Sequence, residues 1–155
     1  MIAIRLFEPA DAPALRRVFE SAIHGTARRD YSQREVDAWA PRVHDVAAWA
    51  ERMGALAPFV ALVDGEIKGY ADVQADGYID HFYVAAEAGG TGVGDRLMRR
   101  VLARAEELGL PGLHSQVSLT AQPFFAHVGF EVVEQRVVEV RGVEMRHVAM
   151  RKRLR

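Results

Sequence analysis

The sequence contains no cysteine. This absence excludes disulfide bonds, thiolate metal sites and a cysteine nucleophile, and it is compatible with the cytosol. The chain also lacks any apolar run that approaches the ~20 residues a membrane-spanning helix needs. Its first residues, MIAIRLFEPAD, have neither the basic start nor the long apolar run of a secretory signal peptide. We therefore expect a cytoplasmic protein without a membrane partner.

An excess of charge of either sign is lacking as well. The formal net charge is −1, and 26% of the residues are charged. This balance gives no electrostatic reason to expect nucleic acid or an anionic membrane as a partner. His114, His127 and His147 are scattered without metal-ligand spacing, so we expect no bound metal. The 155 residues fit one domain, residues 1–155, which is long enough to bury a core.

Strand-like and helix-like segments are both present. The expected strands are residues 2–7, 58–65, 66–77, 78–84, 112–118, 131–140 and 143–150, with hairpin signals at Asp64-Gly65, Asp76-Gly77 and Arg141-Gly142. The expected helices are residues 8–25, one or two between 26 and 54 broken at Pro41, 95–108, and a short one in 120–130 capped by Thr120. These elements predict an α+β or mixed α/β fold.

A glycine-rich turn follows the strand expected at 78–84 and leads into a helix. Its sequence, AEAGGTGVGDRLM at residues 86–98, has glycine at positions 89, 90, 92 and 94. Glycine loses the most conformational freedom on folding, so this many suggest that a ligand comes close to the main chain. The first turn of a helix leaves backbone N–H groups unpaired and carries positive dipole character. The turn therefore predicts an anion site.

Two phosphate-binding motifs do not fit this turn. Gly89 and Gly94 have the spacing of a nucleotide P-loop, but Asp95 stands where that loop has lysine. Gly90 and Gly92 begin a dinucleotide fingerprint, but Asp95 again occupies its third small position. A glycine-rich turn without any ligand is the remaining alternative to an anion site.

A third motif fits better. The run GGTGVG followed by DRLMRRVLARAEELG resembles the CoA-binding loop and helix of the GCN5-related N-acetyltransferases (GNATs). Their pattern is Gln or Arg, two residues, Gly, one residue, then Gly or Ala. Gly92 and Gly94 match its end, whereas Gly89 replaces the Gln or Arg. A second family motif is matched in order and at the usual distance by Ser118, Ala121, Phe124, Phe125, Gly129 and Phe130. Upstream, RDYS and AWAP look like a subgroup of small bacterial members of unsettled substrate.

The resemblance covers essentially the whole chain. It implies a mixed, mostly antiparallel sheet of about six to seven strands, flanked by helices and splayed between its fourth and fifth strands. Acetyl-CoA would enter the gap as co-substrate, with its diphosphate on the glycine turn and its pantetheine arm along the preceding strand. The cofactor-binding residues implied are Phe82, Tyr83, Val84, Gly89, Gly90, Thr91, Gly92, Val93, Gly94, Ser118, Phe124 and Phe125.

Acetyl transfer to an amine needs a group that removes a proton and a donor for the oxyanion. By the same resemblance, the backbone N–H near Val84 is the oxyanion donor. In its strand, Asp80 is expected on the face of Tyr78, Phe82 and Val84, where a charge is costly unless it is paired or wet. Asp80 is therefore the first candidate for the base or the ammonium-binding group, with a structural ion pair as the alternative. His81, on the opposite face, is the second candidate because histidine titrates near neutrality.

The leaving thiolate lacks the family's usual partner. Phe125 stands where GNATs commonly have a tyrosine that protonates the CoA sulfur, and phenylalanine has no proton to give. Either the thiolate leaves unaided, which a thiol pKa of about 8.5 allows, or another hydroxyl replaces the tyrosine. The candidates are Tyr78, Ser118 and Tyr31.

The acceptor pocket is expected over the open side of the splayed sheet. His24, Tyr31 and Trp39 combine aromatic surface with polar tips, as ligand pockets do, and we assign Tyr78 to the same pocket. Core packing is the alternative for Trp39. The sequence thus predicts an N-acetyltransferase acting on a small amine, with a peptide amine as a variant. A non-catalytic acyl-CoA sensor is the alternative, and a homodimer through exposed strands or the last hairpin is compatible with so small a sheet.

Overall fold

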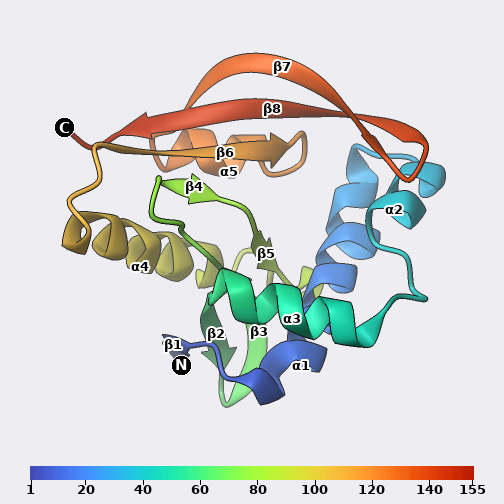
Figure 1. Cartoon of the computed structure of the whole chain (residues 1–155), viewed down its shortest axis with the longest axis horizontal. Helices are drawn as coiled ribbons and strands as arrows, with labels where there is room; N and C mark the ends of the chain where they lie inside the picture. Colours follow the sequence, from blue (N-terminus) through green and yellow to red (C-terminus); the bar gives the residue numbers. More distant parts are fainter.

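The computed structural model, which describes residues 1–155, contains two four-stranded β-sheets (Figure 1). In the first sheet the order is β1 (Ile2–Leu6), β2 (Phe59–Val63), β3 (Glu66–Ala71) and β5 (Phe82–Val84). In the second it is β4 (Tyr78–Ile79), β6 (Gly112–Ser118), β8 (Val143–Arg153) and β7 (Glu131–Val140). Only β4 and β6 pair in parallel, so the sheets are mostly antiparallel, as predicted.

The chain also forms five α-helices. They are α1 (Ala12–Ser21), α2 (Gln33–Trp39), α3 (Val46–Leu56), α4 (Val93–Glu107) and α5 (Gln122–His127). A π-helical turn, Ala22–Thr26, extends α1, and short 3₁₀ turns occupy Pro9–Asp11, Ala27–Arg29 and Ala86–Ala88. Ser32 caps α2 and Asp45 caps α3, each through a side-chain oxygen that accepts a backbone N–H. The expected break near Pro41 is therefore confirmed as the gap between α2 and α3.

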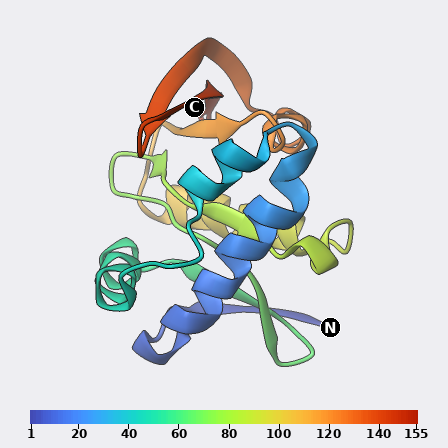
Figure 2. The same ribbon diagram turned by 90° about the vertical axis from the view of Figure 1, so that its right-hand side faces the viewer.

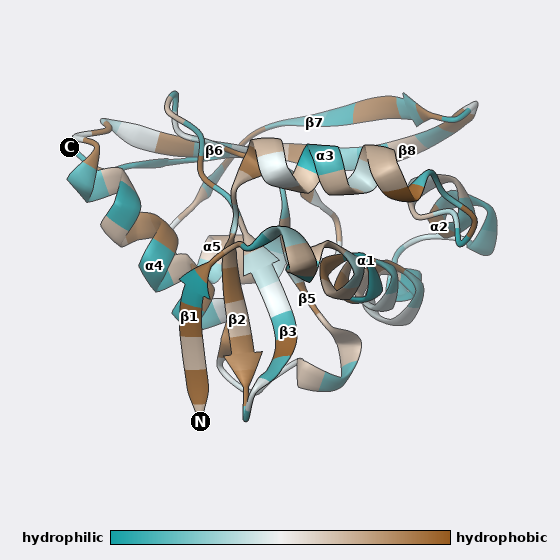
Figure 3. Ribbon diagram, turned by 60° about the horizontal axis from the view of Figure 1, so that its bottom comes forward, coloured by the Kyte–Doolittle hydropathy of each residue, from teal (hydrophilic) through white to brown (hydrophobic).

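The helices cover both faces of the first sheet. Helix α4 packs on one face, against β1, β2 and β3, and α1 packs on the other, with α3 against α1 (Figure 3). The apolar stripe of α4 is fully buried through Leu97, Val101 and Ala105. Burial of one such leucine or valine contributes about 1.5–3 kcal/mol. These two layers hold β5, and the glycine turn that follows it, in a fixed position.

The segment 78–84 departs from the prediction of one strand. It divides at Asp80 into β4, which joins the second sheet, and β5, which joins the first. The fold therefore has eight strands rather than six or seven. The two sheets separate after β4, because β6 pairs with β4 but β5 lies at the edge of the other sheet. The splay expected between the fourth and fifth predicted strands is present at this point.

The last third of the chain follows the predicted order closely. Helix α5 carries Pro123 in its first turn, and β7 and β8 form the final hairpin. The expected cap by Thr120 was wrong, because the side chain of Ser118 accepts the N–H of Ala121 instead (3.0 Å). The turn of the β7–β8 hairpin lies on the same side of the molecule as α2 (Figure 2). There the Arg141 side chain donates to the carbonyl of Ala38 of α2 (2.7 Å). No helix has both the length and the apolar character that crossing a membrane requires.

Candidate active site

A cavity of about 360 Å³ opens where the two sheets separate. Its walls come from β5, the glycine turn, the first turn of α4, the start of α5 and the π-helical end of α1. The cavity is lined by most of the residues expected to bind the cofactor: Phe82, Tyr83, Val84, Gly89, Gly90, Gly92, Gly94, Ser118, Phe124 and Phe125. Two expected residues do not line it. The Thr91 hydroxyl donates to the carbonyl of Ala88, and Val93 is fully buried in the core under α4.

The glycine turn presents free amides to this cavity. Gly89 donates its N–H to the carbonyl of Ala86 (3.3 Å), but the N–H groups of residues 90–95 donate to no acceptor in the protein. Gly90 and Gly92 have φ angles of +75° and +93°, a region that side chains other than glycine rarely adopt. A run of free N–H groups at a helix N-terminus can bind a phosphate or diphosphate.

Gly94 packs closely against an aromatic side chain that lines the cavity. A Cβ atom at this position would lie 3.3 Å from the ring of Phe124. The Phe124 ring packs in turn against Phe82 at 5.5 Å between centroids, and Phe125 lies at the same distance from Phe82. Phe125 is also buried in the core, so it serves both as core and as cavity wall.

Strand β5 offers unpaired backbone groups along the same cavity. Ala85 donates its N–H to Lys68 of the first sheet, and the carbonyl of His81 accepts from that sheet. Inward- and outward-pointing N–H groups alternate along an antiparallel strand, so those of Phe82 and Val84 point away from β3. Because β5 is the edge of its sheet, no strand pairs with them on that side. They are free to bond an extended ligand or an oxyanion.

A second, smaller cavity of about 160 Å³ adjoins the first. Trp39, Tyr83 and Ser118 line both cavities, so a group bound in one can meet a group bound in the other. The remaining lining residues are Tyr31, Tyr78, Asp80, Gln116, Val138, Val140, Met145, Arg146 and His147. Most of these side chains are aromatic or apolar, Asp80 is the single carboxylate, and Arg146 and His147 are the basic residues.

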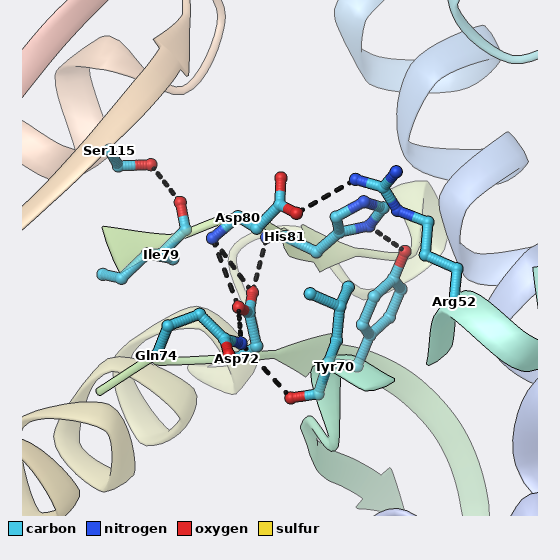
Figure 4. Close-up of polar contacts among 9 residues, drawn as sticks. Arg52, Tyr70, Asp72, Gln74, Ile79, Asp80, His81 and Ser115 are labelled. Atoms are coloured by element: carbon cyan, nitrogen blue, oxygen red, sulfur yellow. Dashed lines mark hydrogen bonds and ion pairs between the residues drawn. The ribbon is translucent and has the colours of Figure 1, made fainter. Parts of the chain in front are cut away.

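Asp80 supplies that carboxylate. Its Oδ2 atom is 2.9 Å from Arg52 of α3, whereas Oδ1 accepts no hydrogen bond from the protein, and 28% of the side chain is exposed (Figure 4). The ion pair expected as the alternative is present, and Asp80 also lines the smaller cavity. Asp80 lines this cavity with Tyr78, as expected, but the expected shared face with Phe82 and Val84 is wrong, because these two residues line only the larger cavity.

The structure does not bring His81 to either cavity. Its ring is buried between Phe19 and Trp49, and Nδ1 lies 3.0 Å from the hydroxyl of Tyr70. Burial, aided by the positive charge of Arg52, lowers the pKa of His81 to about 3. A neutral, enclosed imidazole is not placed to remove a proton from a bound amine, so the expectation of His81 as a base is corrected.

The residues expected in the acceptor pocket divide into two groups. Tyr31, Trp39 and Tyr78 line the smaller cavity, as expected. His24 lies outside both cavities, where Nε2 is 2.7 Å from the carbonyl of Ala40. This contact fixes the segment after α2, which gives His24 a structural position rather than a place in the pocket.

Only one of the three hydroxyls expected to serve the thiolate lines both cavities. Tyr31 already donates to the carbonyl of Arg146 (2.5 Å) and accepts the N–H of Leu119 (3.0 Å). Tyr78 lines only the smaller cavity. Ser118 lines both and accepts one N–H, and its own proton is not donated within the protein.

Two polar residues of the site were missed by sequence reasoning. The hydroxyl of Thr120, beside the larger cavity, is buried and has no hydrogen-bond partner. Asp72, directly after β3, is 1% exposed and accepts backbone N–H groups from Asp80 and His81. The second had a sequence signal, since a carboxylate in the apolar run GYADV is costly unless bonded. The first is the residue that the sequence pattern predicts as a helix cap.

Comparison with known proteins agrees with this geometry. Residues 27–154 match the family model described as Acetyltransferase (GNAT) domain. Over 135 residues the chain is 31% identical to the Uncharacterized N-acetyltransferase YafP of Escherichia coli (strain K12), covering 87% of this chain and 85% of that protein. It is similar to a GCN5-related N-acetyltransferase from Rhodopseudomonas palustris, with a TM-score of 0.94, 28% identity and coverage of 98% and 95%. The fold is also that of yncA from Salmonella typhimurium, solved with its cofactor acetyl-CoA, with a TM-score of 0.72, 22% identity and coverage of 100% and 95%.

Proposed function

The chain belongs to the GNAT acetyltransferase family, and we propose that it moves the acetyl group of acetyl-CoA onto a primary amine of a small molecule by direct attack. One observation carries this proposal. The glycine turn with its free N–H groups, the open edge of β5 and the carboxylate of Asp80 lie along two cavities that share lining residues. The glycine turn would bind the diphosphate, the edge of β5 would bind the extended pantetheine arm, and Asp80 would bind the amine. Acetyl transfer from acetyl-CoA needs these three sites next to one another in this order.

The larger cavity fits CoA. The glycine turn would hold the diphosphate, and the outward N–H groups of Phe82 and Val84 would pair with the amides of the pantetheine arm. Phe124 and Phe125 would cover the arm. The buried, unpartnered hydroxyl of Thr120 is a further point of fit, because a polar group left unsatisfied in a protein interior costs about 1–3 kcal/mol.

The smaller cavity fits the acceptor amine. Oδ1 of Asp80 would accept a proton from the ammonium, since only Oδ2 is engaged by Arg52. The amine nitrogen then forms a bond to the thioester carbon, and the N–H of Val84 donates to the carbonyl oxygen as it becomes negative. The carbon–sulfur bond breaks, and the second proton that the amide nitrogen loses passes to the departing thiolate, to which the hydroxyl of Ser118 donates a hydrogen bond.

The walls of this cavity favour a small acceptor over a polypeptide. Tyr31 bonds to Arg146 of β8, and Arg141 of the β7–β8 turn bonds to Ala38 of α2. These bonds join α2 and the segment before it to the hairpin beside the cavity, whose volume is only about 160 Å³. The faces of Trp39 and the tyrosines suit a cation with an apolar body. We therefore propose a compact primary amine that carries an aromatic or aliphatic group.

Turnover with a panel of amines tests the proposed function. We expect the purified protein to release free thiol from acetyl-CoA when a suitable small amine is present, with the N-acetyl product identified by mass spectrometry. CoA should also stabilise the fold, by about 2.7 kcal/mol at a hundredfold excess over its Kd. If the protein binds CoA but releases no thiol with any amine of the panel, the non-catalytic acyl-CoA sensor is favoured. Phe125 in place of the usual tyrosine is the observation that supports this alternative. Absence of CoA binding would contradict both functions.

Replacement of Thr120 by valine is expected to act in opposite directions on two measurements. Valine keeps the shape and removes a hydroxyl that has no partner in the protein, so thermal stability without CoA should stay equal or rise. CoA affinity, measured by calorimetric titration, should fall by about 3- to 10-fold because one hydrogen bond is lost. Thr120→Ser, which keeps the hydroxyl, is the control and should bind CoA nearly as the parent does. A Thr120→Val protein that is less stable but binds CoA equally would show that the hydroxyl serves the fold instead.

A further inference from the structure

The turn of the chain at Asp80 depends on a carboxylate that lies eight residues earlier in the sequence. Asp72 Oδ1 accepts the N–H of His81 (2.6 Å) and the N–H of Asp80 (3.1 Å), and Oδ2 accepts the side-chain amide of Gln74 (2.6 Å; Figure 4). Asp72 is 1% exposed and forms no ion pair. A buried carboxylate without a cation is tolerated only when donors surround it, and here three do.

This carboxylate takes the place of a backbone acceptor. The N–H of Asp72 donates to the carbonyl of His81 (3.1 Å), as in a regular antiparallel pair. The return bond of such a pair would run from the N–H of His81 to the backbone carbonyl of Asp72, but here it ends on the side chain. The regular ladder therefore stops at His81, and the N–H of Asp80 is bonded outside any strand.

Ser115 holds the other side of the break. Its hydroxyl donates to the carbonyl of Ile79 (2.8 Å), at the point where β4 pairs with β6 (Figure 4). Asp72 and Ser115 thus bond three successive backbone groups, the C=O of Ile79 and the N–H groups of Asp80 and His81. The backbone between β4 and β5 is fixed from both sheets.

The break decides which cavity Asp80 meets. In an unbroken strand Asp80 would share a face with Phe82, which lines the CoA cavity. In the structure, Ile79 packs in the same core as Phe82, so the alternation of faces is interrupted between them. Asp80 lies with Tyr78 in the smaller cavity instead. A shift of register by one residue moves a side chain to the opposite face.

We infer that Asp72 is a positioning residue, which holds the break between β4 and β5 and thereby places the Asp80 carboxylate in the acceptor cavity rather than in the CoA cavity. Its role is to accept hydrogen bonds, not to carry charge toward the substrate, because it lines neither cavity. The catalytic part of this inference rests on the proposed function. The positional part concerns the fold alone and is tested separately.

A double-mutant cycle tests the catalytic part. Asp72→Ala is expected to lower kcat about 100-fold, since a displacement of about 1 Å at a reacting group has an effect of that size. CoA affinity should fall much less than kcat, because the hydrogen bonds of Asp72 reach only the start of β5 and not the glycine turn. If Asp72 acts through Asp80, the same change made in an Asp80→Asn protein lowers kcat by less than about threefold further. Equal losses in both backgrounds would overturn the inference.

Two further variants separate positioning from general loss of stability. Asp72→Asn keeps an oxygen for the backbone N–H groups, and the Gln74 amide can turn to offer its own oxygen, so kcat should stay within about tenfold of the parent. Asp11→Ala is the matched control, because Asp11 is also a buried, bonded aspartate but lies at the start of α1, held by Arg5. It should lower stability and leave kcat unchanged. A loss of kcat in Asp11→Ala equal to that of Asp72→Ala would contradict a positioning role.

Amide hydrogen exchange tests the positional part without any activity. The N–H groups of Asp80 and His81 are expected to be protected in the parent protein and in Asp11→Ala, and to exchange at least tenfold faster in Asp72→Ala. If Asp72→Ala does not fold, Ser115→Ala is tested in its place. We expect faster exchange of the Asp80 N–H in this variant. We also expect a loss of kcat that is absent when the same change is made in the Asp80→Asn protein. Unchanged exchange at both residues would overturn the inference. Faster exchange at Asp80 and His81 in Asp72→Ala would support the positional part even if the parent protein had no acetyltransferase activity. That absence of activity would contradict the proposed function alone.

Discussion

Asp80→Asn is expected to lower kcat for acetyl transfer by about 10²- to 10⁴-fold, the usual contribution of a positioned proton acceptor. Asparagine has nearly the same size but does not accept a proton from an ammonium. CoA affinity should be unchanged, because Asp80 lines only the acceptor cavity. The measurements are thiol release at saturating substrates over a range of pH and CoA titration by calorimetry.

Arg52→Gln is the control for this prediction. It breaks the ion pair with Asp80 but leaves the carboxylate in place. The pair is partly exposed, and pairs of that kind contribute about 0–1 kcal/mol, so stability should change little. We expect kcat to change by less than about fivefold. If Arg52→Gln and Asp80→Asn lose kcat equally, the ion pair is structural and Asp80 is not the base; equal rates for the parent and Asp80→Asn at every pH would also exclude it.

Gly94→Val is expected to weaken CoA binding at least 100-fold, which corresponds to about 2.7 kcal/mol. The new side chain starts 3.3 Å from the Phe124 ring and projects into the larger cavity beside the free amides. Folding should be affected far less, because valine has a better helix propensity than glycine and the partly exposed Phe124 can shift. CoA affinity by calorimetry and stability by thermal unfolding separate the two effects.

Gly54→Val is the matched control for the change at Gly94. Gly54 is exposed on α3, and a Cβ there meets no atom within 4 Å. The control should bind CoA with the affinity of the parent. If Gly94→Val also binds CoA with parental affinity, the glycine turn is not the diphosphate site.

The glycine turn and most helices and strands are predictable from sequence because they rest on local signals. The hairpin expected at Asp76-Gly77 is wrong, because β3 and β4 on either side of it lie in different sheets. Gly90 and Gly92 require positive φ angles, and the apolar stripe of α4 follows the helical period. The hairpin turns at Asp64-Gly65 and Arg141-Gly142 also have positive φ angles and lie where turn residues predict them. Each of these features depends on residues that are neighbours along the chain.

The orientation of Asp80 and the environment of His81 were not accessible in the same way. Period-two alternation predicts one continuous strand, and only a side chain eight residues away, Asp72, interrupts it. The burial of His81 depends on Phe19 and Trp49, from two different helices. Such contacts are formed by tertiary packing, which local patterns do not specify.

A crystal structure with bound CoA tests the central claim most directly. We expect the diphosphate oxygens to lie within hydrogen-bonding distance of the N–H groups of residues 90–94, with the pantetheine arm along β5 and its sulfur near Ser118. A structure in which the diphosphate binds elsewhere, and the N–H groups of residues 90–94 turn to carbonyls of the protein, would contradict the proposed function.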